Sequence, residues 1–216
     1  MDKDKLTNML RQASQEVDVG LNASQIELFC LYLRELLEWN RKFNLTAVKN
    51  TEDMIIKHFV DSLTPLPYLP FGGLLDIGSG AGFPGIPLKI AAPRLQVKLV
   101  DASRKKVSFL KHIIRTLGLT DVTAVQSRIE NMDRPEPSFQ ILISRAFRRL
   151  EDLLQVVSPL LRPGNTLVAM LGPTGEEERT KLRGLACTEG LELNQTIVLD
   201  LPYGRGKRTL LFFNKN

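Results

Sequence analysis

The fold of this chain is decided by the stretch Leu74-Leu75-Asp76-Ile77-Gly78-Ser79-Gly80-Ala81-Gly82-Phe83-Pro84-Gly85. Its first apolar residues predict a buried strand, and the residues from Pro84 to Ile90 predict a helix. The glycines between them permit a tight turn that brings a ligand close to bare backbone N–H groups. A strand, a glycine-rich turn and a helix in this order are typical of nucleotide-binding α/β proteins.

A carboxylate follows at the distance that such a site requires. Asp101 ends the next apolar run, 21 residues after Gly80, where it can accept hydrogen bonds from ribose hydroxyls. The glycines also satisfy the G-x-G-x-x-G pattern of dinucleotide dehydrogenases, so an NAD-dependent oxidoreductase is an alternative. Asp76, however, precedes the first glycine and completes a D-x-G-x-G-x-G pattern that resembles class I methyltransferases. A carboxylate there suits the ammonium group of S-adenosylmethionine better than it suits a phosphate.

Short apolar runs alternate with longer amphipathic segments from residue 73 onward. Strands are predicted at 74–77, 97–100, 122–125, 141–143, 166–170, 196–199 and 209–213, and helices at 84–90, 105–117, 150–161 and 176–184. The alternation predicts a doubly wound, mostly parallel α/β sheet covered on both faces, with an antiparallel C-terminal edge. The ligand crevice of such a sheet lies at the carboxyl ends of its strands.

The first 65 residues are predicted to be helical. Ser24-Gln25-Ile26-Glu27 has the spacing of a capping box, and a second helix is expected from Thr51 to Leu63, before Pro65 and Pro67. We therefore expect residues 1–70 to form an N-terminal helical extension packed on the core. Residues 71–216 are expected to form the ligand-binding domain.

Composition narrows the class of protein. A hydrophobic content of 43% in 216 residues supports one substantial core. No apolar run is long enough to span a bilayer, and the charged N-terminus does not resemble a signal peptide, so we expect a cytoplasmic protein without a membrane association. Cys30 and Cys187, with two histidines, have neither zinc-site spacing nor the pattern of a disulfide framework, so no metal is expected. P-loop and nucleophile-elbow motifs are absent, which disfavours an NTPase or a hydrolase.

Positive charge is concentrated in the later part of the chain. Residues 1–75 carry 8 Lys and Arg against 10 Asp and Glu, whereas residues 76–216 carry 21 against 14. This asymmetry is expected where a polyanion such as RNA docks, although a solvated basic surface gives the same count.

Three further motifs make a family resemblance close. They are W-N-x-x-x-N-L-T at 39–46, H-x-x-D-S at 58–62 and S-R-A at 144–146. With the glycine stretch, the chain from about residue 20 to 212 resembles the ribosomal RNA small subunit methyltransferase G family, also called glucose-inhibited division protein B. The resemblance implies a Rossmann-like domain that binds S-adenosylmethionine. It also implies methylation of guanine N7 at position 527 of bacterial 16S rRNA, in the 530 loop, on 16S rRNA or the 30S subunit, by what we expect to be a monomer.

The resemblance also implies roles for individual residues. The residues expected to bind the cofactor are Asp76, Gly78, Gly80, Phe83, Asp101, Ile129, Glu130 and Arg145. Asn44 and Arg145 are the expected catalytic residues, and the expected RNA contacts are His58, Lys105, Lys106, Arg128 and Arg208. Because guanine N7 has a free lone pair at neutral pH, we expect these residues to position groups rather than to abstract a proton.

The chain departs from the family pattern at two positions. Gln140 replaces the usual aspartate before the fourth strand, and Leu171 replaces a lysine after the fifth, which puts one RNA or active-site contact in doubt. Neither change touches the glycine stretch. The alternatives are a methyltransferase for another RNA or a protein, the oxidoreductase, and an RNA-binding chaperone that kept the fold.

Overall fold

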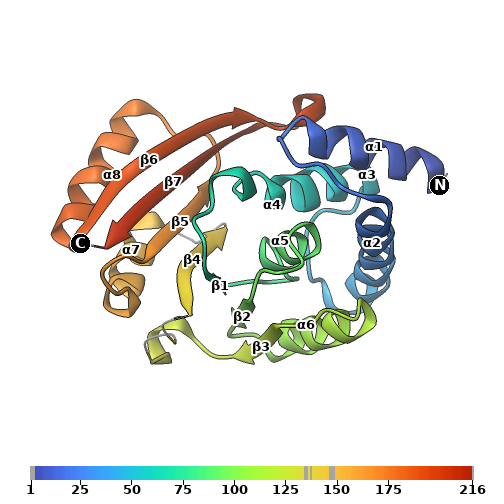
Figure 1. Cartoon of the computed structure of the whole chain (residues 1–216), viewed down its shortest axis with the longest axis horizontal. Helices are drawn as coiled ribbons and strands as arrows, with labels where there is room; N and C mark the ends of the chain where they lie inside the picture. The colour runs from blue at the N-terminus through green and yellow to red at the C-terminus, as the bar shows by residue number, and fades with distance from the viewer. Residues whose placement is uncertain (1–2, 134–135, 137, 146–148, 216) are drawn as a thin grey trace.

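The computed structural model describes residues 3–133, 136, 138–145 and 149–215 (Figure 1). Its described strands form one seven-stranded sheet in the order β3-β2-β1-β4-β5-β7-β6. The strands are β1 (Gly73–Ile77), β2 (Val97–Asp101), β3 (Val122–Gln126), β4 (Phe139–Arg145), β5 (Thr166–Leu171), β6 (Leu191–Asp200) and β7 (Lys207–Lys215). The first five pair in parallel, and β7 is antiparallel to both β5 and β6. The predicted fold class is therefore confirmed.

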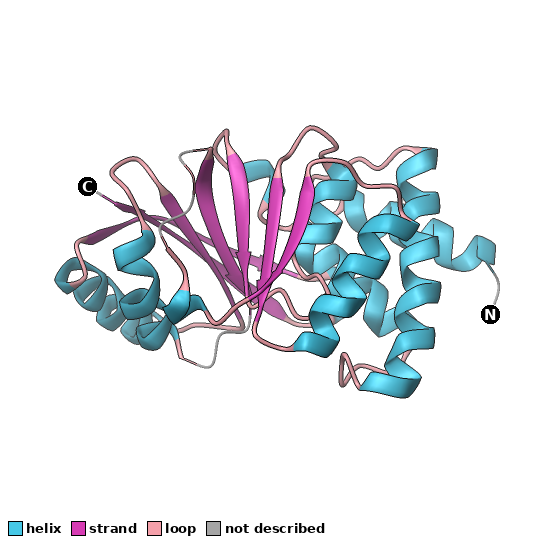
Figure 2. Cartoon of the chain, turned by 90° about the horizontal axis from the view of Figure 1, so that it is seen from below, coloured by secondary structure: helices cyan, strands magenta, loops and turns pink. Residues whose placement is uncertain are grey.

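Helices cover both faces of the sheet (Figure 2). They are α1 (Lys3–Gln15), α2 (Ala23–Phe43), α3 (Thr51–Met54), α4 (Asp61–Leu63), α5 (Gly85–Ala91), α6 (Arg104–Thr116), α7 (Leu150–Val157) and α8 (Glu176–Thr188). Short 3₁₀ turns occur at Leu66–Tyr68, Ile129–Asn131, Ser158–Leu160 and Pro202–Gly204. Side chains of α1, α2, α5 and α6 share one hydrophobic cluster with one face of the sheet, and those of α7 and α8 cover the other face.

The boundaries of several elements differ from the prediction. The helix expected from Thr51 to Leu63 is continuous, but its middle turn, Ile55–Val60, is π-helical. Helix α2 begins earlier than the proposed Ser24 cap, because the side chain of Asn22 accepts from Gln25 N and Gln25 bonds back to Asn22 N. The capping-box prediction was therefore wrong in position, since Asn22 offers the same three-residue spacing and caps at least as well as serine. Strand β6 starts five residues before the expected Thr196 and contains a register shift.

Alternation along the strands determines which side chains can meet. Ile141 and Ile143 of β4 and Leu210 and Phe212 of β7 belong to the cluster beneath the N-terminal helices. Successive strand residues point to opposite faces of the sheet. Arg145 comes two residues after Ile143 and therefore lies on this same face. By the same rule, Arg208 lies on this face at the start of β7. Two cations that lie 63 residues apart in the sequence thus face the same helices.

No described helix has the length and apolar character that a membrane crossing requires.

Candidate functional site: the carboxyl edge of the sheet

The glycine turn between β1 and α5 is held by the second strand. The N–H groups of Gly78 and Ser79 donate to the carbonyl oxygen of Val100 at 2.9 and 3.0 Å. The hydroxyl of Ser79 accepts from Val100 N at 3.0 Å and donates to the carbonyl oxygen of Asp76 at 2.9 Å. Gly78 and Gly80 have φ values of +70° and +60°, a region that other residues occupy only at a cost. The glycines are therefore required by the shape of the turn.

Asp101, at the end of β2, fixes the turn from the other side. Its Oδ2 accepts from Gly80 N at 2.9 Å, and its Oδ1 accepts from Ser103 N at 2.8 Å. The ammonium group of Lys106 lies 3.6 Å from Oδ2. The structure thus places Lys106, an expected RNA contact, beside the expected ribose-binding carboxylate.

A pocket of about 280 Å³ opens between the glycine turn and the ends of β2 and β3. It is lined by Ile77, Gly78, Val100, Asp101, Ala102, Ser127, Arg128, Ile129 and Glu130. The structure brings together four expected cofactor residues, and with them Arg128, an expected RNA contact. Apolar side chains and two carboxylates in one pocket suit a nucleoside, because a base packs on apolar surface and ribose hydroxyls donate to carboxylates.

Asp76 lies beneath the turn and does not line this pocket. Its Oδ2 accepts from Gly85 N at 2.9 Å, while its buried Oδ1 has no hydrogen-bond partner among the described residues. Burial raises the pKa of Asp76 to about 7. A Cβ atom on Gly85 would come within 2.8 Å of Oδ2, so this glycine is needed for the close approach of helix and strand. The direct role of Asp76 in this structure is to support the turn.

Phe83 connects the turn to the N-terminal helices. Its ring stacks on Tyr32 at 5.6 Å and on His58 at 4.7 Å between centroids. The guanidinium carbon of Arg145 lies 5.0 Å from the centre of the same ring, a cation–π distance. The Tyr32 hydroxyl donates to the carbonyl oxygen of Ala81, and the Phe83–Pro84 peptide bond is cis. Sequence reasoning missed Tyr32, whose position on an apolar helix stripe gives no sign of this contact.

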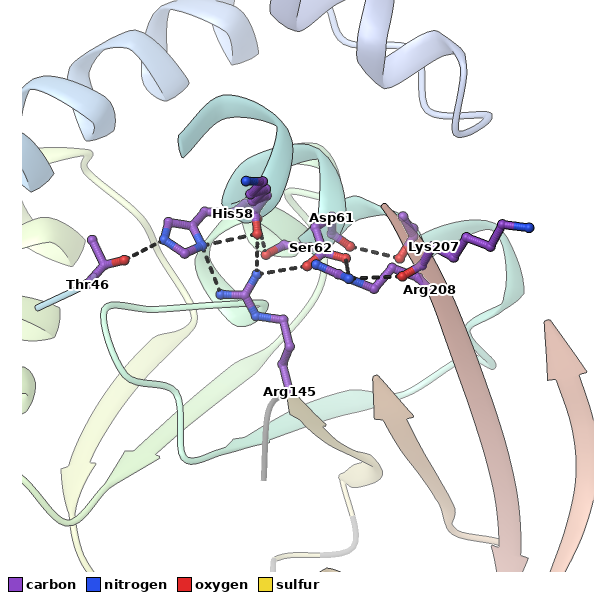
Figure 3. Close-up of polar contacts among 9 residues, drawn as sticks. Thr46, His58, Asp61, Ser62, Arg145, Lys207 and Arg208 are labelled. Carbon is purple, nitrogen blue, oxygen red and sulfur yellow. Dashed lines mark hydrogen bonds and ion pairs between the residues drawn. The ribbon is translucent and has the colours of Figure 1, made fainter. Parts of the chain in front are cut away.

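Two arginines converge on Asp61, at the start of α4 (Figure 3). Arg145 Nη1 donates to Asp61 Oδ2 at 3.2 Å, and Arg208 Nε donates to Oδ1 at 2.7 Å. Arg145 Nη1 also donates to the carbonyl oxygen of Lys57 at 3.0 Å. Asp61 is only 1% exposed, so its charge is neutralised by these cations rather than by water. Sequence reasoning did not assign it a role, although its place one turn after His58 in H-x-x-D-S puts the two side chains on one helix face.

His58 links this ion pair to the loop before α3. Its Nδ1 lies 3.1 Å from the carbonyl oxygen of Lys57 and 3.3 Å from Arg145 Nη2. Its Nε2 lies 2.6 Å from Thr46 Oγ1, and Thr46 N donates to the side chain of Asn40 at 2.9 Å. Burial, together with the charge of Arg145, lowers the pKa of His58 to about 3. The histidine is therefore a neutral bridge at physiological pH.

A second pocket, of about 430 Å³, lies beside the ion pair at the carboxyl ends of β4 and β5. It is lined by Val48, Lys57, His58, Asp61, Arg145, Met170, Leu171, Gly172 and Arg208. One cavity thus contains two of the expected RNA contacts, His58 and Arg208, and the expected catalytic residue Arg145. Leu171, which replaces the lysine usual in the family, lies in the wall of this cavity.

Three predicted features lie outside these pockets. Asn44 is exposed and ends α2 with a left-handed backbone, its N–H donating to the carbonyl oxygen of Asn40. Lys105 is exposed on the first turn of α6. Ala146 and Phe147, which follow Arg145 in the family motif, lie outside the described residues.

A doubly wound sheet with a glycine turn after its first strand and a carboxylate ending its second has the architecture of class I methyltransferases. Solved structures agree in fold. A magnesium protoporphyrin IX methyltransferase from Synechocystis PCC 6803 with bound SAM is similar with a TM-score of 0.61 and 14% identity, covering 86% of this chain and 97% of that one. A SAM-dependent methyltransferase from Aquifex aeolicus is similar with a TM-score of 0.56 and 17% identity, covering 75% and 93%.

Sequence comparison identifies the family. Residues 25–203 match the model of the rRNA small subunit methyltransferase G family. The ribosomal RNA small subunit methyltransferase G of Syntrophus aciditrophicus is 39% identical over 214 residues, covering 96% of this chain and 89% of the relative. That of Carboxydothermus hydrogenoformans is 40% identical over 205 residues, covering 93% and 87%. The chain belongs to the rRNA small subunit methyltransferase G family, and the resemblance described above is confirmed.

Proposed function

We propose that this enzyme transfers a methyl group from S-adenosylmethionine to N7 of guanine 527 in the 530 loop of 16S rRNA. The observation that carries the proposal is the pocket between the glycine turn and Asp101, in a chain of this family. The names of the relatives support the small-subunit rRNA as the substrate, and the family resemblance supplies the nucleotide and the atom.

The residues present fit the proposed cofactor. The pocket offers the carboxylates of Asp101 and Glu130 for ribose hydroxyls and the side chain of Ile129 for the adenine. A Cβ atom on Gly78 would meet no atom within 4 Å and would point into open space. Asp76 Oδ1, buried and without a partner among the described residues, leaves one acceptor available beneath the turn. When bound, the cofactor supplies an electrophilic methyl group on a sulfonium.

The chain's own residues would act by positioning. The N7 lone pair of guanine needs no deprotonation, so we assign no residue as a general base. Arg145, held over Phe83 by Asp61 and His58, would orient the methionine end of the cofactor. Asn44 would contact the substrate from the end of α2. Proximity and alignment of N7, methyl carbon and sulfur would then provide most of the rate enhancement.

RNA would approach along the carboxyl edge of the sheet. His58, Lys106, Arg128 and Arg208 lie at this edge, and Lys105 is exposed beside them on α6. We further propose that the enzyme acts as a cytoplasmic monomer on 16S rRNA or the 30S subunit. The division into a helical extension, 1–70, and a methyltransferase domain, 71–216, is kept as a proposal, with a continuous hydrophobic cluster joining the two.

Methyl transfer from labelled S-adenosylmethionine to 30S subunits from a strain without this activity tests the proposal. Borohydride and aniline treatment followed by primer extension maps N7-methylguanine, and a new stop at guanine 527 is expected. Label in RNA at another position would indicate a different nucleotide, and label only in protein would overturn the RNA assignment. Calorimetry with S-adenosylhomocysteine and with NAD separates the methyltransferase from an oxidoreductase, since only the former compound is expected to bind.

A further inference from the structure

The pair of arginines on Asp61 has an unbalanced charge. Arg145 and Arg208 share one carboxylate, which leaves one positive charge in excess. Their side chains are only 15% and 22% exposed, so water solvates this excess poorly. Burying an uncompensated charge is unfavourable, and such a site favours an anion that completes the balance.

The groups that line the pocket do not supply that anion, and the buried carboxyl group of Asp76, whose charge also acts on Arg145, has its pKa raised to about 7. His58 is neutral, with its Nδ1 3.3 Å from Arg145 Nη2. The ammonium group of Lys57, which also lines the pocket, lies 3.1 Å from Asp53, so its positive charge is already paired. Within the described part of the chain, Asp61 is the pocket's one carboxylate, and both of its oxygens are already bonded to guanidinium groups.

Each of the two guanidinium groups keeps one nitrogen without a hydrogen-bond partner among the described residues. Arg208 uses Nε toward Asp61 and Nη1 toward the carbonyl oxygen of Lys207, at 3.0 Å. Its Nη2 group has no partner among the described residues. Arg145 uses Nη1 and Nη2, and its Nε likewise has no described partner. A guanidinium fixed on one side with free N–H groups on the other is suited to bind an oxyanion.

We propose that the pocket at the ends of β4 and β5 binds one phosphodiester of the substrate RNA through Arg208, and that Asp61, which also holds Arg145, is the residue that positions the guanidinium group of Arg208 for it. The inference rests on the proposed function in taking RNA as the substrate. The cavity of about 430 Å³ has room for a nucleotide, and its apolar wall of Val48, Met170 and Leu171 lies beside the cations. The phosphate would hold the strand beside the cofactor pocket, so that the target base enters from this side.

A set of synthetic stem-loop RNAs with the 530-loop sequence, each containing a single neutral methylphosphonate linkage, tests the site. One linkage is expected to weaken binding to the wild-type protein about tenfold, as for the loss of a charge-assisted hydrogen bond. In Arg208→Gln, binding to unmodified RNA should fall by a similar factor, and that linkage should have no further effect. The salt dependence of binding should also lose about 0.7 from its logarithmic slope, the contribution of one contact to single-stranded RNA.

Lys207→Gln is the matched control, because Lys207 precedes Arg208 on β7 and its exposed side chain points away from Asp61 (Figure 3). Lys207→Gln removes one positive charge, as Arg208→Gln does. The methylphosphonate linkage that weakens binding to the wild type should weaken binding to Lys207→Gln by the same factor. Asp61→Asn makes the protein more positive, so a purely electrostatic contribution would strengthen RNA binding. The positioning role predicts weaker binding instead, with the sensitivity to that linkage lost.

Thermal unfolding and affinity for S-adenosylhomocysteine show whether each variant is folded and whether the cofactor pocket is intact. The proposal is overturned if every linkage affects wild type and Arg208→Gln equally, or if the wild type binds none of these RNAs at low salt. It is also overturned if Arg208→Gln loses affinity for S-adenosylhomocysteine but not for RNA, since Arg208 would then serve the cofactor's carboxylate. Methyl transfer to 30S subunits by the wild type is scored separately, so failure of the proposed function remains distinguishable.

Discussion

Replacing Gly78 by aspartate places a side chain directly in the proposed cofactor pocket. Gly78 lines that pocket, has φ at +70°, and an added Cβ would meet no atom of the protein within 4 Å. The protein itself therefore tolerates the new atoms sterically, and the cost to folding is the left-handed backbone, about 1 kcal/mol for an aspartate. A bound nucleoside, in contrast, would overlap with the new side chain.

The expected loss of affinity follows from the hydrogen bonds at stake. Asp101 and Glu130 line the pocket and would accept from the ribose hydroxyls. Each bond to a charged acceptor contributes about 1.5–3 kcal/mol. Displacing the nucleoside from both removes at least about 3 kcal/mol, which raises the dissociation constant more than about 100-fold. The third carboxylate adds repulsion toward the other two and leaves no compensating contact.

Calorimetry with S-adenosylhomocysteine measures this loss, and urea unfolding measures the effect on stability. Gly118→Asp is the matched control, because Gly118 has φ at +61°, equally open surroundings and a place after α6, away from the pocket. Both variants should lose about the same stability, and only Gly78→Asp should lose cofactor affinity. RNA binding should remain in both. Affinity within threefold of wild type in Gly78→Asp would refute the assignment of the turn.

Three further predictions concern buried ionisable groups and are measured by urea unfolding across pH. Because folding raises the pKa of Asp76 to about 7, the folded state binds this proton more tightly than the unfolded state, and the wild type loses stability as pH rises from 4 to 7. Asp76→Asn should remove that loss, which amounts to up to about 4 kcal/mol. An unchanged dependence of stability on pH would contradict this prediction. The effect of His58 on stability has the opposite sign, because folding lowers its pKa to about 3 and stability therefore declines as pH drops below 6.5. His58→Gln should make the stability less dependent on pH in this acidic range. An imidazole ring that NMR shows to be protonated at pH 6 would exclude a neutral bridge. A hydrogen bond from His112 at 2.8 Å lowers the pKa of Glu35. Glu35→Gln should therefore lower the free energy of unfolding by about 1 kcal/mol at pH 7, and by progressively less as pH falls through the pKa of folded Glu35. A loss of stability that persists in acid would point to packing instead.

Most of the fold was predictable from the sequence because its signals are short-range. Apolar runs mark each strand, and Gly78 and Gly80 mark a turn whose φ values few other residues adopt. The cap of α2 was misplaced because Asn22 and Ser24 both present three-residue spacing, and only the packed helix selects between them. The π-helical turn at Ile55–Val60 has no local signal of this kind.

The candidate site was predictable only in part. The pocket beside the glycine turn follows from the sequence, because Gly78 comes directly after β1, Asp101 ends β2, and the carboxyl ends of adjacent parallel strands share one edge. The position of Asp76 beneath the turn was not predictable, since burial and the contact with Gly85 depend on how α5 packs on β1.

By itself, the sequence determined the order of the elements, the glycine turn and the family, because these depend on residue types at fixed spacing. The tertiary structure decided that Arg145 and Arg208 share Asp61 and that His58 is neutral. The physical reason is that strands β4 and β7 approach one helix only through the pairing of β5 between them. The charge balance between the two arginines and Asp61, and the desolvation of His58, depend on the packing of the sheet against that helix and have no local signal in the sequence.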